Sequence, residues 1–206
     1  MASLIRTLPP WIEYGLDGWP LDGAEPSGDC EILAPFDGGV VFGVADGLGH
    51  GPEAAEAARR AAQTCRDNAE RPIAELFDLC HEALRYTRGA VISVASLNHR
   101  GGCIEWAGIG NAEGVLYRGG RRPDHDSLTL RGGVVGYRYP KLRSVSVPIR
   151  KGDVVIFATD GIGSAFLEVE PGDLQAQELA SLILTRYGKR TDDALVLAVR
   201  YHGDGS

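Results

Sequence analysis

Two segments that lie far apart in the sequence have the same form, an apolar run that ends in Asp-Gly. Residues 40–45 lead to Asp46-Gly47, and residues 154–159 lead to Asp160-Gly161. A carboxylate at the end of a buried strand is held by the sheet, and the glycine allows a sharp turn that brings backbone close to whatever the carboxylate binds. Either Asp-Gly alone is typical of a simple turn, so the evidence lies in the repetition.

Further acidic residues stand at the expected edges of other strands. Asp29 follows Ser27-Gly28 and precedes a short apolar run, and Asp192-Asp193 comes directly before the apolar run 194–199. Carboxylates and carbonyls are the ligands that Mg²⁺ and Mn²⁺ prefer over nitrogen or sulfur. The four positions therefore predict a site for one or two oxygen-ligated divalent ions.

A glycine-rich turn joins the first Asp-Gly to a helix. Residues 46–51 read Asp-Gly-Leu-Gly-His-Gly and run into Pro52, which suits the first turn of a helix. Such a turn exposes backbone N–H groups to an anion. It matches neither the P-loop nor the dinucleotide-binding pattern, so as a phosphate-binding loop it is only suggestive.

The elements that must position these residues follow from apolar periodicity and chain breakers. Helices are predicted over residues 54–69, with the start near Pro52, and over 72–86 and 173–187. Strands are predicted over residues 11–19, 30–34, 40–45, 90–97, 103–107, 114–117, 142–147, 153–159 and 194–201. Runs of strands interrupted by helices predict an α+β layered domain with sheets inside and helices outside.

The composition limits the class of protein. The chain has 206 residues, of which 44% are hydrophobic, and a formal net charge of −7; this predicts one domain over residues 1–206 with no sensor domain. The 28 acidic against 21 basic residues argue against a nucleic-acid partner. No stretch suits a membrane span or a signal peptide, so we expect no membrane partner and a cytoplasmic location. The four cysteines form no Cys-x-x-Cys pair, which indicates neither a zinc knuckle nor a disulfide framework.

Five motifs in order carry a family resemblance: Ser27-Gly28-Asp29, residues 46–51, residues 108–111 (Gly-Ile-Gly-Asn), Thr159-Asp160-Gly161 and Thr191-Asp192-Asp193. Together they resemble the bacterial branch of the type 2C metal-dependent Ser/Thr protein phosphatases, which contains sporulation and stress-response enzymes. The resemblance spans residues 29–199. It implies a four-layer αββα sandwich of two central, mainly antiparallel sheets flanked by helices, with a two-metal centre between the sheets.

The resemblance also implies a ligand set for two Mn²⁺ or Mg²⁺ ions. Asp46 would bridge both ions, and the other implied ligands are Asp29 and the Gly47 carbonyl for one ion, Asp160 and Asp192 for the second, and Asp193 as a supporting or alternative ligand. Two such ions activate a shared water for in-line attack on phosphorus. Asp46 and Asp160 would therefore be catalytic through the water that their ions hold.

The chain departs from the family pattern at several positions, and those at His50 and Asn111 bear on the chemistry. His50 is a candidate general acid, but it stands four residues after Asp46, whereas eukaryotic relatives place their histidine two residues after, where Leu48 stands here. A loop-stabilising role for His50 is the stronger reading. Asn111 occupies a place where many relatives carry an aspartate linked to a third ion, so two ions are expected. Gly49, Gly110 and Asn111 would lie near the substrate.

The leading hypothesis is a phosphoserine and phosphothreonine phosphatase that acts on stressosome or related stress-signalling proteins and resets the pathway. Thr87-Arg88-Gly89-Ala90, at the start of a strand, and the lack of a sensor domain resemble the feedback phosphatases of that system. One alternative is a phosphatase of a phosphorylated anti-sigma factor antagonist, and another is a non-catalytic binding module of the same fold. An aspartyl-nucleophile phosphatase is disfavoured because it needs Asp-x-Asp at a strand tip, which Asp46 and Asp160 both lack.

Overall fold

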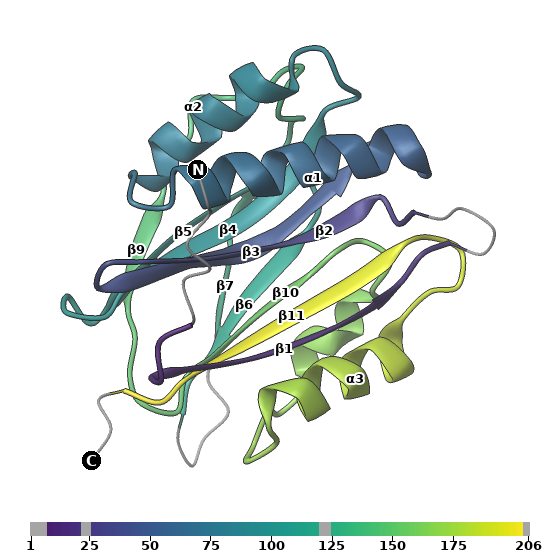
Figure 1. Cartoon of the computed structure of the whole chain (residues 1–206). Coiled ribbons are helices and arrows are strands. Elements are labelled where there is room, and N and C mark those ends of the chain that lie inside the picture. Colours follow the sequence, from purple (N-terminus) through teal and green to yellow (C-terminus); the bar gives the residue numbers. More distant parts are fainter. Residues whose placement is uncertain (1–7, 22–25, 120–124, 204–206) are drawn as a thin grey trace.

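The computed structural model describes residues 8–21, 26–119 and 125–203 (Figure 1). In chain order its elements are β1 (Ile12–Trp19), β2 (Asp29–Phe36), β3 (Gly39–Gly47), α1 (Pro52–Asp67), α2 (Ile73–Leu84), β4 (Ala90–Asn98), β5 (Cys103–Ile109), β6 (Glu113–Tyr117), β7 (His125–Ser127), β8 (Leu130–Arg131), β9 (Val145–Pro148), β10 (Val154–Ala158), the 3₁₀ helix η1 (Ser164–Glu168), α3 (Ala176–Tyr187) and β11 (Ala194–Tyr201). Each of the strands and helices predicted from the sequence is found, with shifted ends.

The strands form two sheets that lie face to face between layers of helices. One sheet has the order β2-β3-β4-β5-β8, with β9 also paired to β5, and the other has the order β1-β11-β10-β6-β7. The described strand pairs are antiparallel except β5 with β8. Helices α1 and α2 cover the first sheet, and α3 with η1 covers the second (Figure 1). The expected αββα sandwich is therefore confirmed.

The central strands read as continuous apolar runs because both of their faces are buried. In β3, Val40, Phe42 and Val44 pack between the two sheets, while Val41 and Ala45 pack against α1 and α2. Strands β10 and β11 divide their side chains in the same way between the inter-sheet core and the core under α3. Strands held on both faces give the carboxylates at their ends a rigid support.

Helix α1 lies close to the first sheet because its buried face is made of small residues. Ala54, Ala57, Ala58 and Ala61 are fully buried on that face. The turn from β3 into α1 is equally tight, since a Cβ placed on Gly47 would lie 2.0 Å from the backbone oxygen of Ala54. Only glycine fits there, and the fit fixes the Asp-Gly turn against the start of the helix.

The differences from the sequence prediction lie at element ends and in short elements. Helix α3 begins at Ala176 rather than at residue 173, because Gln175 and Glu178 form a capping box that sets the first turn. The strand predicted over 142–147 is β9 and begins at Val145. The sequence analysis missed β7, β8 and η1, which have 3, 2 and 5 residues and are too short to show a period.

Two further features of the described chain concern membrane-spanning helices and the cysteines. In the part of the chain that the structure describes, no helix combines the length and apolar character needed to cross a membrane. All four cysteines are free, and Cys65 and Cys80 are buried between α1 and α2 with their sulfur atoms 3.6 Å apart. The four cysteines are therefore thiols in this structure.

Candidate metal centre

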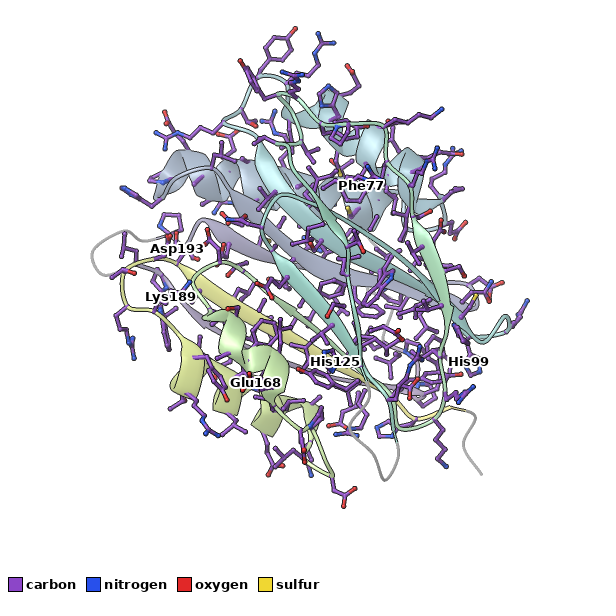
Figure 2. The ribbon with its side chains drawn as sticks, turned by 180° about the vertical axis from the view of Figure 1, so that it is seen from behind. Phe77, His99, His125, Glu168, Lys189 and Asp193 are labelled. Atoms are coloured by element: carbon purple, nitrogen blue, oxygen red, sulfur yellow. The ribbon has the colours of Figure 1, made fainter. Side chains whose placement is uncertain are left out.

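The predicted carboxylates come together at one edge of the molecule, from both sheets. The register of β2 with β3 pairs Asp29 directly with Asp46. On the other sheet, Asp160 follows β10, and Asp192 and Asp193 precede β11. All five carboxylates line one cleft of ≈ 520 Å³. Figure 2 shows Asp193 at this end of the sheets and His99 and His125 at the opposite end.

The loops around the cleft contribute the other residues singled out from the sequence. Gly49, His50, Gly110 and Asn111 line the cleft, and His50 is exposed to solvent. Gly47 is the exception, because it is buried and is not a lining residue. The other lining residues are Leu21, Leu48, Val91, Gly132, Gly133, Val134 and Thr191.

Burial and mutual repulsion oppose the negative charge of two of these carboxylates. Burial, and then the charges of Asp29, Asp160, Asp192 and Asp193, raise the pKa of Asp46 to about 8. The pKa of Asp29 rises to about 7, chiefly through burial and against the hydrogen bond that its carboxylate accepts from a neighbouring hydroxyl. A divalent cation compensates the same charges that a proton compensates here.

The donor chemistry of the cleft fits a hard divalent cation. Its five acidic side chains all offer oxygen, which Mg²⁺ and Mn²⁺ prefer. Within the described ranges, no three His, Cys, Asp or Glu side chains already stand in a metal-holding arrangement. The carboxylates therefore share one cleft without converging on one point.

Thr159 links the two sheets at the centre of the site, a role that the sequence analysis did not assign. Its side chain is buried, with 2% of its surface exposed. The hydroxyl donates a hydrogen bond to Asp29 Oδ2 at 2.7 Å and accepts one from the Leu195 N–H at 2.9 Å. In the sequence, the position of Thr159 directly before the second Asp-Gly could have indicated this role. Its hydrogen-bond partners, however, lie 130 and 36 residues away along the chain.

The two adjacent aspartates differ in what their oxygens already bind. Asp193 is 4% exposed, and its Oδ1 and Oδ2 accept hydrogen bonds from the backbone N–H groups of Leu21 at 2.7 Å and Gly28 at 2.9 Å. Asp192 is half-buried and accepts one hydrogen bond, from the Asp193 N–H at 2.9 Å. Backbone donors thus occupy both carboxylate oxygens of Asp193. The hydrogen bond to Asp192 occupies only one of its oxygens and leaves the other available to a ligand.

Asp160 is oriented by two neighbours. The Asn111 side-chain amide donates a hydrogen bond to Asp160 Oδ2 at 2.7 Å. Lys189 Nζ donates to the Asp160 backbone oxygen at 2.7 Å, and Figure 2 shows Lys189 on the same edge as Asp193. The amide holds one carboxylate oxygen and leaves the second available to a ligand.

Comparison with known proteins places this site in a family. The model of the family "Stage II sporulation protein E (SpoIIE)" matches residues 37–202. Phosphoserine phosphatase RsbX of Bacillus subtilis (strain 168) is 25% identical over 144 residues, which are 68% of this chain and 70% of RsbX.

Two solved structures share the fold over nearly the whole chain. One comes from work on the bacterial stressosome as a modular system adapted to control secondary messenger signalling; it has a TM-score of 0.83 at 31% identity and covers 92% of this chain and 99% of its own. The other, RsbX in complex with magnesium, has a TM-score of 0.85 at 19% identity and covers 95% and 98%. The chain belongs to the Stage II sporulation protein E family, and it shares its fold with the type 2C phosphatase domain of SpoIIE from Bacillus subtilis.

Proposed function

We propose that this protein removes phosphate from phosphoserine or phosphothreonine on stressosome or related stress-signalling proteins, and so resets their signalling. The observation that carries the proposal is the single cleft into which two sheets direct five carboxylates. The substrate class is supported by the likeness to RsbX, named a phosphoserine phosphatase, and to a chain from work on the stressosome. In this proposal residues 1–206 act as one catalytic domain in the cytoplasm.

The ligand assignment follows the carboxylates that remain open to an ion. Asp46, Asp29 and the Gly47 carbonyl would hold one Mn²⁺ or Mg²⁺ ion, and Asp46, Asp160 and Asp192 would hold the other. Asp193 supports the site through its two backbone hydrogen bonds. When bound, the two ions supply an activated water and offset charge on the phosphoryl oxygens.

The chain's own residues orient these ligands and serve the leaving group. Thr159 fixes one oxygen of Asp29, and Asn111 fixes one oxygen of Asp160. Electrostatic preorganisation of this kind is the main means by which phosphoryl transfer is catalysed. Because the His50 imidazole lines the cleft and is exposed to solvent, we assign it the donation of a proton to the departing serine or threonine oxygen in place of a loop-stabilising role.

The test is phosphate release from p-nitrophenyl phosphate and from phosphorylated stressosome scaffold proteins with Mn²⁺, with the lost sites located by mass spectrometry. EDTA should abolish release, and Asp46→Asn or Asp160→Asn should eliminate it. Asp37→Asn is a matched control, because Asp37 lies in the exposed turn between β2 and β3. Undiminished turnover in either site variant refutes the proposal.

The same assay separates the alternatives. Activity confined to a phosphorylated anti-sigma factor antagonist assigns a different substrate within the same reaction class. Mn²⁺ binding without turnover on any phosphoprotein identifies a binding module that keeps the fold.

A further inference from the structure

The cleft that receives the phosphate ester has no lysine or arginine among its described lining residues. Phosphate esters carry about −1.5 to −2 charges near neutral pH, so a cation from the rim would strengthen their binding. Arg88, Lys189 and Arg190 are candidates because each contacts or adjoins a lining residue. All three have partners: Lys189 Nζ donates to the Asp160 backbone oxygen, the Arg190 guanidinium stacks 3.7 Å from the ring centroid of Trp19, and Arg88 pairs with the exposed carboxylate of Glu53.

Arg88 stands directly over the turn that lines the cleft. A Cβ placed on Gly49 would lie 2.8 Å from Arg88 Nη1, so the guanidinium rests on the bare backbone of this glycine. Arg88 Nη2 forms an ion pair with Glu53 in the first turn of α1. The backbone beneath is fixed, because the Leu48 N–H donates to the Gly89 oxygen at 3.1 Å.

The Arg88 guanidinium can exchange the Glu53 carboxylate for another anion. The side chains of Arg88 and Glu53 are 47% and 70% exposed, and ion pairs in water contribute little to stability. A phosphate dianion offers a guanidinium two parallel charge-assisted hydrogen bonds, which are stronger than a single contact with an exposed carboxylate. The Arg88 guanidinium, on which the exchange takes place, lies beside Gly49, a residue of the cleft wall.

We infer that Arg88 is a substrate-binding residue whose guanidinium leaves Glu53 and binds the phosphoryl oxygens over Gly49. Glu53 competes with the substrate for this cation. The inference rests on the proposed phosphatase function and adds to it the residue that recognises the phosphoryl group.

The experiment compares Arg88→Ala, Arg88→Lys, Glu53→Gln and Arg85→Ala in the Mn²⁺-loaded protein, with p-nitrophenyl phosphate as substrate and inorganic phosphate as inhibitor. Arg88→Ala should raise both KM and the inhibition constant of phosphate by roughly 10-fold or more, the loss typical of a charged hydrogen bond. Arg88→Lys should restore part of the affinity. Arg85→Ala is the control, because Arg85 pairs with Glu82 at 3.2 Å with a similar exposure of 55% and 66%.

Glu53→Gln gives the decisive contrast, since it removes the same ion pair but frees the cation. KM and the inhibition constant should fall in this variant, whereas a purely structural role of the pair would move both variants in the same direction. Unchanged constants in Arg88→Ala, or a parallel change in both variants, overturn the inference. If the wild-type protein has no turnover, the proposed function fails, and calorimetry of inorganic phosphate with the Mn²⁺-loaded variants still decides the role of Arg88.

Discussion

The surroundings of Asp46 disfavour its ionised carboxylate when no cation is bound. Burial and the neighbouring aspartates raise its pKa from 3.8 to about 8. A protein selected only for stability would place an apolar or neutral side chain at this position. The buried Asp46 carboxylate lowers the stability of the metal-free protein. Metal binding by its ionised form explains why this residue is an aspartate.

The pH dependence of stability follows from this pKa. The folded metal-free protein holds the Asp46 proton more tightly than the unfolded chain, so its free energy of unfolding falls as the pH rises from about 4 to about 8. Asp46→Asn removes this contribution, and its melting temperature in EDTA should therefore exceed that of the wild-type protein at pH 8 by more than at pH 5. Thermal melts at the two pH values measure the difference, and an equal difference at both contradicts the assigned pKa.

Thr159 is predicted to set metal affinity through Asp29. Thr159→Val keeps the shape of the side chain but removes the hydrogen bond to Asp29 and leaves the Leu195 N–H without its acceptor. Loss of a side chain that hydrogen-bonds to a metal ligand typically weakens metal binding by roughly 10- to 100-fold. Calorimetry with Mn²⁺ measures this loss, and Thr159→Ser should retain most of the affinity. Equal affinity in the valine variant would show that Asp29 needs no orientation.

At the scale of elements, the site depends on how closely α1 approaches the end of β3. Gly47 joins the two, and its missing side chain lets the backbone of Ala54 come within reach. Gly47→Ala should destabilise the protein by about 1–3 kcal/mol, because backbone rather than a flexible side chain must move. Denaturant unfolding checks this value. Gly132→Ala is the matched control, since no atom lies within 4 Å of its added Cβ, and equal losses in both variants would contradict the packing account.

The sequence predicted the long elements well because burial on both faces leaves a clear signal. Strands such as β3 and β10 are continuous apolar runs, and the six buried alanines of α1 identify a helix that packs closely. Strands β7 and β8 carry too few residues for such a signal, and their pairing depends on neighbours elsewhere in the chain. The start of α3 depended on the side chains of Gln175 and Glu178.

The candidate site was predictable to the level of its carboxylates. An acidic residue at the end of a buried strand, followed by glycine, has a position that local sequence can define, as for Asp46 and Asp160. The role of Thr159 could not be predicted, because its partner Asp29 lies 130 residues away. Asp193 was named as a supporting or alternative ligand, and the sequence could not decide between the two because its partner Gly28 lies 165 residues away. Local sequence likewise gave no sign that Arg88 lies over Gly49, since that contact depends on the packing of two loops.

At the scale of the whole molecule, the centre is a joint product of the two sheets. Asp29 and Asp46 come from one sheet, and Asp160 and Asp192 flank strands of the other. Neither sheet alone supplies the full set of proposed oxygen ligands. Metal binding should therefore tie the sheets together and stabilise the folded state, as any ligand specific to that state does.

The central claim is that these carboxylates form one two-metal phosphatase centre, and the number of Mn²⁺ ions bound per chain tests it most directly. Isothermal titration calorimetry on the metal-free protein should give about two ions per chain, and Asp46→Asn, which removes the shared ligand, should lose both. Asp37→Asn should bind as the wild-type protein does. A wild-type protein that binds no Mn²⁺, or an Asp46→Asn variant that binds two ions with unchanged affinity, would contradict the account.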